Sequence, residues 1–144
     1  MRLFTIGFTK KTARDFFGKL REAGVRRVID VRLANVSQLA GFAKKDDLAF
    51  FLREIGGIAY VHRPELAPTE ELLRGYRRKT IGWAEYEERF RRLLQERQVE
   101  APLSRQDVDG ACLLCSEPSA ARCHRRLVAE YLKEKWERVE IIHL

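Results

Sequence analysis

The sequence lacks any long hydrophobic run. No apolar stretch approaches the roughly 18 consecutive residues that a membrane-spanning helix needs. The first residues, MRLFTIGFTKK, contain no long apolar segment followed by a small-residue cleavage site, so no signal peptide is expected. Cysteine is scarce, and its count of three is odd, which does not suit a disulfide framework. We therefore expect a protein of the reducing cytoplasm with no membrane partner.

Internal repeats, low-complexity segments and linkers are also missing from the sequence. A chain of 144 residues is long enough to bury one proper core. Its composition, with 45% apolar and 34% charged residues, is that of a globular protein rather richer in charge than most. The sequence thus predicts one domain over residues 1–144.

The charge of the chain is strongly basic, at +7 with a pI near 9.6. Such a balance favours polyanions as partners, either nucleic acid or a phosphate-bearing small molecule. A surface of ion pairs is the alternative explanation. Three Glu–Arg pairs at i, i+4 spacing, with Glu first, support that alternative over one stretch, namely Glu85–Arg89, Glu87–Arg91 and Glu88–Arg92.

Apolar periodicity predicts strands that alternate with helices. The expected strands are Leu3–Gly7, Val25–Val31, Ile58–His62, Gly110–Cys115 and Val139–Ile142. The expected helices are Thr12–Gly24, Lys45–Ile55, a short one capped by Thr69, Trp83–Gln98 and Ser119–Lys135, while Val99–Asp109 reads as a surface loop. This alternation predicts an α/β fold, a mostly parallel open sheet of about five strands flanked by helices.

Polar clusters follow four of the predicted strands. In a parallel sheet the carboxyl ends of the strands share one edge, where ligands of such folds bind. The clusters are Thr5–Thr9, Asp30–Arg32, His62–Glu65 and Cys115–Glu117. We therefore expect them to converge on one site if the sheet is parallel.

The densest group of chemically capable residues lies between Gly110 and Arg126, with the sequence GACLLCSEPSAARCHRR. Cys115 ends a buried strand before a loop and a helix start, which is one route to a lowered thiol pKa. Rhodanese-type sulfur carriers and cysteine phosphatases share this layout. However, Arg122 comes one residue later than in a phosphatase loop, and Glu117 would repel an anion. Cys115 is thus either reactive or a small packed side chain.

The other cysteines and their neighbours also have two interpretations. Cys112 stands three positions before Cys115, so it should point to the opposite face of the sheet and belong to the core. Cys123 and His124 either face the core at helical spacing or, in the case of His124, carry a proton. A metal site would need these residues together with Cys115 and His62, but the spacing matches no standard zinc pattern, so we expect no metal.

Charged residues supply the remaining candidates. Asp30 is either an ion-pair anchor for an arginine or a catalytic base, and Glu117 is either an acid/base group or a cap of the following helix. Arg125 is a candidate anion clamp. A second group of cations, with fewer acidic neighbours, is the best candidate for a phosphate-contacting patch: Arg74, Arg77, Arg78 and Lys79.

Several motifs together resemble a known family. They are TIGFT, IDVR, Phe42, YVHRPEL and, most specifically, LLCSEP followed by CHR. This combination resembles the Domain of Unknown Function 488 family and implies a cytoplasmic α/β domain without an established reaction. The chain departs from the family in having Phe8 where a histidine is common, and Leu66–Ala67–Pro68 where Gly-Gly is frequent; Pro102–Asp109 looks like an extra loop.

The leading functional hypothesis is an enzyme with a pocket at the strand exits that acts on an anionic, phosphate-bearing or nucleic-acid-related substrate. No cofactor is expected. The alternatives are a non-catalytic nucleic-acid-binding module and a rhodanese-like sulfur carrier on Cys115. The predicted catalytic residues are Cys115, Glu117, His124, His62 and Asp30, and the predicted substrate-binding residues are Arg32, Arg122, Arg125, Phe42 and Thr5.

Overall fold

A computed structural model describes residues 1–34, 41–117 and 119–144 of the chain. Its centre is a five-stranded parallel sheet in the order β3-β2-β4-β1-β5. The strands are β1 (Arg2–Gly7), β2 (Arg27–Asp30), β3 (Ala59–His62), β4 (Ala111–Cys115) and β5 (Glu140–His143). The predicted α/β class and the parallel sheet are therefore confirmed.

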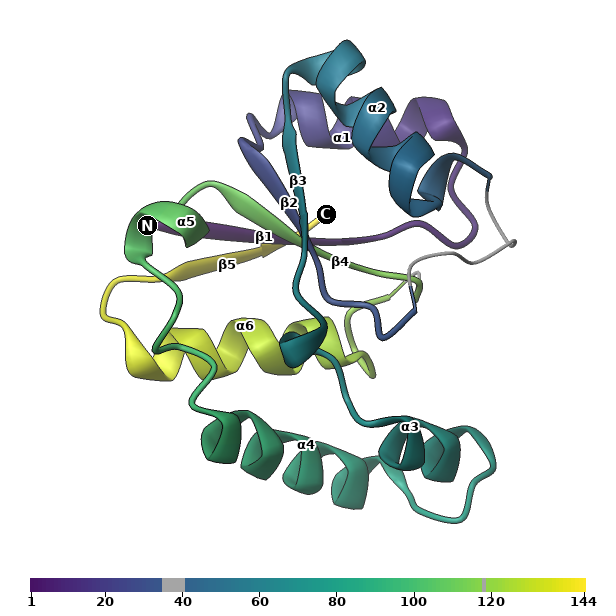
Figure 1. The fold of residues 1–144 in the computed structure, drawn as a ribbon, viewed down its shortest axis with the longest axis vertical. Coiled ribbons are helices and arrows are strands. Elements are labelled where there is room, and N and C mark those ends of the chain that lie inside the picture. The colour runs from purple at the N-terminus through teal and green to yellow at the C-terminus, as the bar shows by residue number, and fades with distance from the viewer. Residues whose placement is uncertain (35–40, 118) are drawn as a thin grey trace.

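Helices cover both faces of the sheet (Figure 1). On one face lie α1 (Ala13–Glu22) and α2 (Lys45–Gly56), and on the other lie α3 (Glu70–Arg77), α4 (Trp83–Arg97) and α6 (His124–Lys135). The short helices are η1 (Gly41–Ala43), η2 (Pro64–Leu66) and α5 (Arg105–Val108). Among the described residues, no helix combines the length and the apolar character needed to cross a bilayer.

Alternation along β4 divides the core into two halves. Cys112 and Leu114 pack on the α1–α2 face, whereas Leu113 and Cys115 pack on the α6 face. The prediction that Cys112 is a core residue on the opposite side from Cys115 is confirmed, since Cys112 is fully buried. Burial raises the pKa of the Cys112 thiol, so this group stays protonated and inert.

Three local predictions were wrong. The segment Val99–Asp109 is not a plain surface loop, because it contains α5, whose capping box at Ser104 and Asp107 stabilises a turn that buries Val108. The helix after β4 begins at His124 instead of Ser119. In α2, the i, i+3, i+4, i+7 spacing of Leu48, Phe51, Leu52 and Ile55 predicts one buried stripe, but only Leu48 and Leu52 are buried, while Phe51 and Ile55 are 36% and 40% exposed.

Candidate functional site

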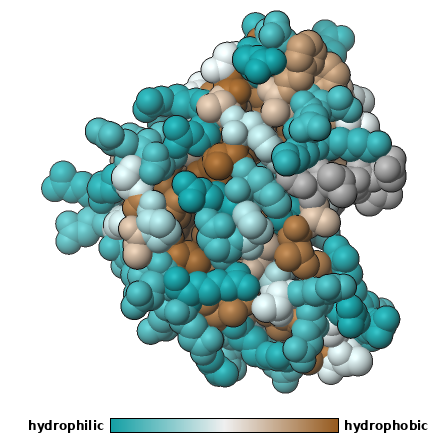
Figure 2. Space-filling view, viewed as in Figure 1, coloured by the Kyte–Doolittle hydropathy of each residue, from teal (hydrophilic) through white to brown (hydrophobic). Residues whose placement is uncertain are grey.

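A cleft of about 1250 Å³ opens beyond the carboxyl ends of the strands. One side consists of residues that follow strands, namely Phe8 after β1, Arg32 after β2 and, from the β4–α6 loop, Ser116, Glu117, Arg122 and Cys123. Helix α3, the turn after it and the start of α4 make the opposite side. The face in Figure 2 shows that hydrophilic side chains dominate the lower edge of the molecule, where α3 and α4 lie.

The exits of β1, β2 and β4 lie together, which confirms part of the predicted convergence. The amide of Thr9 donates to the carbonyl of Ser116 over 3.1 Å, which joins the exits of β1 and β4. Similarly, the amide of Val31 donates to the carbonyl of Leu114 over 3.0 Å. The approach at β1 is so close that a Cβ on Gly7 would collide with the carbonyl of Glu117. Glycine is therefore required at position 7 for the β4–α6 loop to pack against β1.

Four predicted site residues line the cleft: Arg32, Glu117, Arg122 and His124. Glu117 and Arg122 are exposed on the β4–α6 loop, while Arg32 is 5% exposed and forms part of the floor. Cys123 also lines the cleft, although it is largely buried. The β4–α6 loop thus contributes both acidic and basic groups to one wall.

Asp30 does not line the cleft. Its carboxylate is fully buried and accepts twice from the guanidinium of Arg32, with Nε at 2.9 Å and Nη2 at 2.7 Å, and once from the Arg32 amide at 3.1 Å. The hydroxyl of Tyr60 donates to the same carboxylate over 2.6 Å. These contacts match the ion-pair-anchor interpretation, and the arginine that Asp30 holds is Arg32, whose Nη2 also donates to the carbonyl of Ala43 at 2.7 Å. The role of Asp30 in this geometry is to position Arg32.

Four further candidates lie away from the cleft lining: His62, Thr5, Phe42 and Cys115. His62 contacts the carbonyl of Arg32 through Nε2 at 2.7 Å, which ties β3 to the end of β2. The hydroxyl of Thr5 is buried and hydrogen-bonds to Nδ1 of His143 at 2.6 Å. Phe42 packs on the α1–α2 face against Phe16 at a centroid distance of 5.3 Å. The cavity therefore unites only part of the predicted set.

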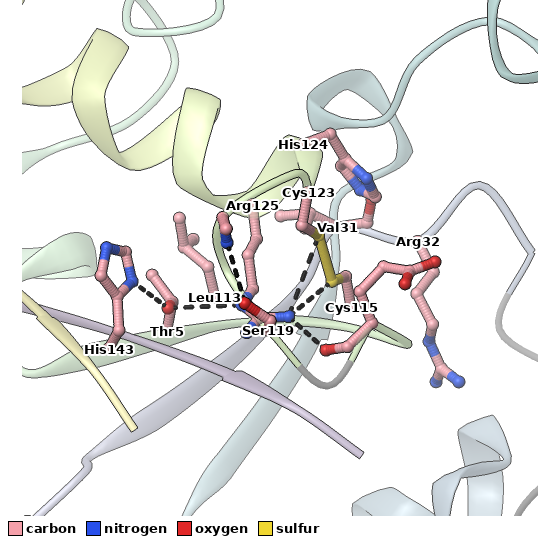
Figure 3. The surroundings of a disulfide bond; sticks show 12 residues. Thr5, Val31, Arg32, Leu113, Cys115, Ser119, Cys123, His124, Arg125 and His143 are labelled. Carbon is pink, nitrogen blue, oxygen red and sulfur yellow. Dashed lines mark hydrogen bonds between the residues drawn. A yellow bond between two sulfur atoms is a disulfide. The ribbon is translucent and has the colours of Figure 1, made fainter. Parts of the chain in front are cut away.

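Arg125 occupies a buried position behind the cleft, with 2% of its surface exposed. Figure 3 shows its guanidinium between Thr5 and the sulfurs of Cys115 and Cys123. Nη1 donates to Cys115 Sγ at 3.0 Å and to the Glu117 carbonyl at 2.5 Å, and Nε donates to Thr5 Oγ1 at 3.3 Å. Burial lowers the pKa of Arg125 from its ordinary value. The contacts give Arg125 a positioning role, because its guanidinium faces the protein interior.

Cys115 and Cys123 are joined sulfur to sulfur as a disulfide (Figure 3). The pair closes the β4–α6 loop, since Cys115 ends β4 and Cys123 is the N-cap of α6. The sequence did not predict this pair. It predicted a helix that starts at Ser119, which would place Cys123 within the helix instead of at its N-cap. The structure thus gives the two cysteines a joint role that the odd cysteine count concealed.

His124 is the imidazole in the cleft wall. Its Nε2 lies 2.7 Å from the carbonyl of Val31, so Nε2 carries the proton and Nδ1 is left as an acceptor. Burial lowers the pKa of His124 to about 4, outweighing that hydrogen bond, and Arg125 adds to the lowering. His124 is therefore neutral near pH 7.

The opposite side of the cleft combines basic and aromatic residues. The predicted phosphate-contacting patch lies here, with Arg77, Arg78 and Lys79 exposed, whereas Arg74 is paired with Glu70 at 2.8 Å. Sequence reasoning missed the aromatic part, because Tyr76, Trp83 and Tyr86 lie within predicted helices and nothing in their spacing distinguishes a cleft wall from other helix positions. These three rings, Tyr76, Trp83 and Tyr86, pack together with centroids 4.9 to 5.6 Å apart.

The remaining basic stretch behaves as the sequence predicted. In α4, Arg89, Arg91 and Arg92 form ion pairs with Glu85, Glu87 and Glu88 respectively. By contrast, Arg77, Arg78, Lys79 and Arg122 have no ion-pair partner within the described parts of the chain. The described residues also contain no group of three or more His, Cys, Asp or Glu side chains arranged to hold a metal ion.

Comparison with known proteins identifies a family but no characterised relative. Residues 12–132 match the family model described as a domain of unknown function, DUF488. No curated protein matches the chain, and no solved structure does so either. The match covers most of the chain, from the start of α1 to α6. The chain belongs to the DUF488 family.

Proposed function

We propose that the cleft binds single-stranded nucleic acid. The observation that carries the proposal is a group of four cations around one aromatic-lined cavity, none of which has an ion-pair partner among the described residues: Arg77, Arg78, Lys79 and Arg122. Cations of this kind release counterions when they contact phosphates, which is the main source of affinity for nucleic acid. The proposal therefore places the backbone of the ligand along these side chains.

The aromatic residues supply the second half of the argument. Tyr76 and Trp83 are half-buried in the cleft lining, so each ring is held in place while part of it stays accessible. Aromatic rings held in this way stack on nucleobases, with about 1–3 kcal/mol for each stacked base and little dependence on sequence. Cations beside aromatic rings are the combination that single-stranded nucleic acid requires.

The size of the cleft also favours an extended ligand. A volume of about 1250 Å³ exceeds the roughly 300–1,000 Å³ of most pockets for small molecules. Arg32 adds a cation with a fixed orientation, because Asp30 and Ala43 hold its Nε and Nη2. Its Nη1 is buried and has no hydrogen-bond partner in the described part of the chain.

A binding role fits the site better than catalysis does. The enzyme hypothesis needs its catalytic groups around one cavity, but Asp30, His62 and Cys115 lie outside the cleft lining. Glu117 and His124 are the predicted acid/base groups that do line it. Binding needs neither of them, and it uses the cations and rings that the cleft does contain.

The test is a titration of the protein with fluorescein-labelled oligo(dT) of about 12 nucleotides, a length within the range of common single-strand sites. Fluorescence anisotropy at low salt should show saturable binding. Inorganic polyphosphate, which has phosphates but no bases, should compete more weakly than unlabelled oligo(dT). No binding at low salt would overturn the proposal, and equal competition by polyphosphate would replace it with a polyanion site that does not read bases.

A further inference from the structure

The β4–α6 loop has a covalent feature that nucleic-acid binding does not explain. Cys115 and Cys123 are 1% and 2% exposed, and their sulfurs are bonded across the base of the loop. We propose that Cys115 and Cys123 are a reversible redox site whose oxidation state controls the loop that forms one wall of the cleft.

Arg125 gives the pair a chemical environment suited to redox exchange. Its Nη1 lies 3.0 Å from Cys115 Sγ and 3.9 Å from Cys123 Sγ. A guanidinium in contact with sulfur stabilises the thiolate, which is the form that attacks disulfides and peroxides. Arg125 also acts to lower the pKa of Cys112, but burial is the larger effect and raises it. Reactivity should therefore be confined to Cys115 and Cys123.

The two sulfurs differ in their access to the outside. Cys123 contributes to the cleft lining, whereas Cys115 lies behind it at the end of β4. A small oxidant that enters the cleft reaches Cys123 first. Cys115 is then the resolving thiol, because it is already in contact with the Cys123 sulfur.

The chemistry balances with a low-molecular-weight disulfide as the oxidant. The Cys123 thiolate attacks one sulfur of the oxidant, forms a mixed disulfide and releases one equivalent of small thiol. The Cys115 thiolate then attacks Cys123 Sγ, forms the Cys115–Cys123 bond and releases the second equivalent. The pair loses two electrons and two protons, and the oxidant gains them as two thiols; reduction by two small thiols runs the same steps in reverse.

The bond matters for the cleft because the loop it closes carries cleft residues. Glu117 and Arg122 lie between the two cysteines, and His124 follows directly. A bridge across this segment restricts its conformations, and reduction releases them. The oxidised loop should present Arg122 in a fixed position, which lowers the ordering cost of binding. This control of affinity rests on the proposed nucleic-acid binding, but the redox chemistry itself does not.

The redox test uses the full chain equilibrated in glutathione buffers of increasing oxidised-to-reduced ratio. The protein is quenched in acid, unfolded, labelled with N-ethylmaleimide and weighed intact. Reduced protein should carry three labels and oxidised protein one, on Cys112. The Cys112→Ser variant should show the same transition with one label fewer in each state. A chain that keeps three labels in the most oxidising buffer, or a bond that involves Cys112, would overturn the proposal.

Single-cysteine variants identify the order of attack. Cys115→Ser should stop at a stable glutathione adduct on Cys123, seen as one added glutathione mass. Cys123→Ser should gain such an adduct far more slowly, because Cys115 is set back from the cleft. Circular dichroism checks that each variant is folded. If a variant is not folded, the change in label count of the wild type still decides whether the redox site exists. Equal adduct formation in folded forms of both variants would overturn the assigned order.

A binding measurement tests the control of the cleft. Oligo(dT) affinity should fall about fivefold on reduction of the wild type, a modest coupling by allosteric standards, and should not change in Cys115→Ser under the same reductant. Equal affinity of the two wild-type forms would overturn the control while leaving the mass transition intact. Absence of any binding would instead reject the proposed function, and the label count would still decide whether the redox site exists.

Discussion

The salt dependence of oligonucleotide binding tests the charge arrangement of the cleft. Four cations in the lining have no ion-pair partner among the described residues: Arg77, Arg78, Lys79 and Arg122. If each contacts one phosphate, the logarithm of the binding constant should fall with the logarithm of salt concentration with a slope of about −3. That slope corresponds to roughly 50-fold weaker binding when salt rises fourfold.

Removal of one cation should change this slope by a predictable amount. Arg78→Gln should reduce the slope to about −2, so the same fourfold rise in salt costs roughly 20-fold in affinity. Arg92→Gln is the matched control, because Arg92 is exposed, pairs with Glu88 at 2.7 Å and lies outside the cleft lining. Both variants lower the net charge equally, so the comparison separates local contacts from the overall field of the protein.

Fluorescence anisotropy with labelled oligo(dT) at a series of salt concentrations provides both slopes. We expect Arg78→Gln to lower the magnitude of the slope and Arg92→Gln to leave it unchanged. An equal effect of the two substitutions would mean that general basicity, not the cleft, attracts the ligand. A wild-type slope near zero would show that phosphate contacts do not contribute.

Three further predictions concern single residues. Trp83→Leu should weaken oligo(dT) binding by about 1–3 kcal/mol through lost stacking while keeping the salt slope, and anisotropy would contradict this if the slope changed instead. Since His124 has a pKa of about 4 in the folded protein, below its ordinary 6.5, the unfolded chain binds the extra proton first as pH falls. Urea unfolding should therefore show a loss of stability of about 3 kcal/mol between pH 7 and pH 4 that is absent in His124→Gln, and an equal loss in the variant would refute the assignment. Asp30→Asn should cost about 3–5 kcal/mol because it leaves the buried Arg32 cation without its counter-charge, whereas a cost under about 1 kcal/mol would show that the pair is not needed.

Local patterns were sufficient for much of the architecture. Apolar runs bounded by glycine located the strands, and their alternation with amphipathic helices predicted the parallel sheet that places the strand exits at one edge. The Glu–Arg spacing in α4 correctly predicted its ion pairs, because residues four apart on a helix are neighbours whatever surrounds them. The sequence also predicted correctly that Cys112 and Cys115 lie on opposite faces of the sheet, since successive side chains of a strand point to opposite faces and the two residues are three positions apart.

The composition of the site depended on distances that local patterns do not contain. Sequence reasoning placed Arg125 at the ligand, yet its guanidinium points inward to Thr5 and the cysteines. It also treated Tyr76 and Trp83 as ordinary helix residues, because an aromatic ring at helical spacing looks the same in a core and in a cleft wall.

The sequence by itself thus determined the α/β class, the edge of the sheet where polar groups collect, and the basic character of α3 and the turn after it. These properties follow from periodicity and charge over a few neighbouring residues. Only the tertiary structure decided which polar groups face the cleft and that Cys115 pairs with Cys123, eight positions away. The reason is that packing between β4, α6 and β1 fixes the path of the β4–α6 loop, and no local propensity specifies that path.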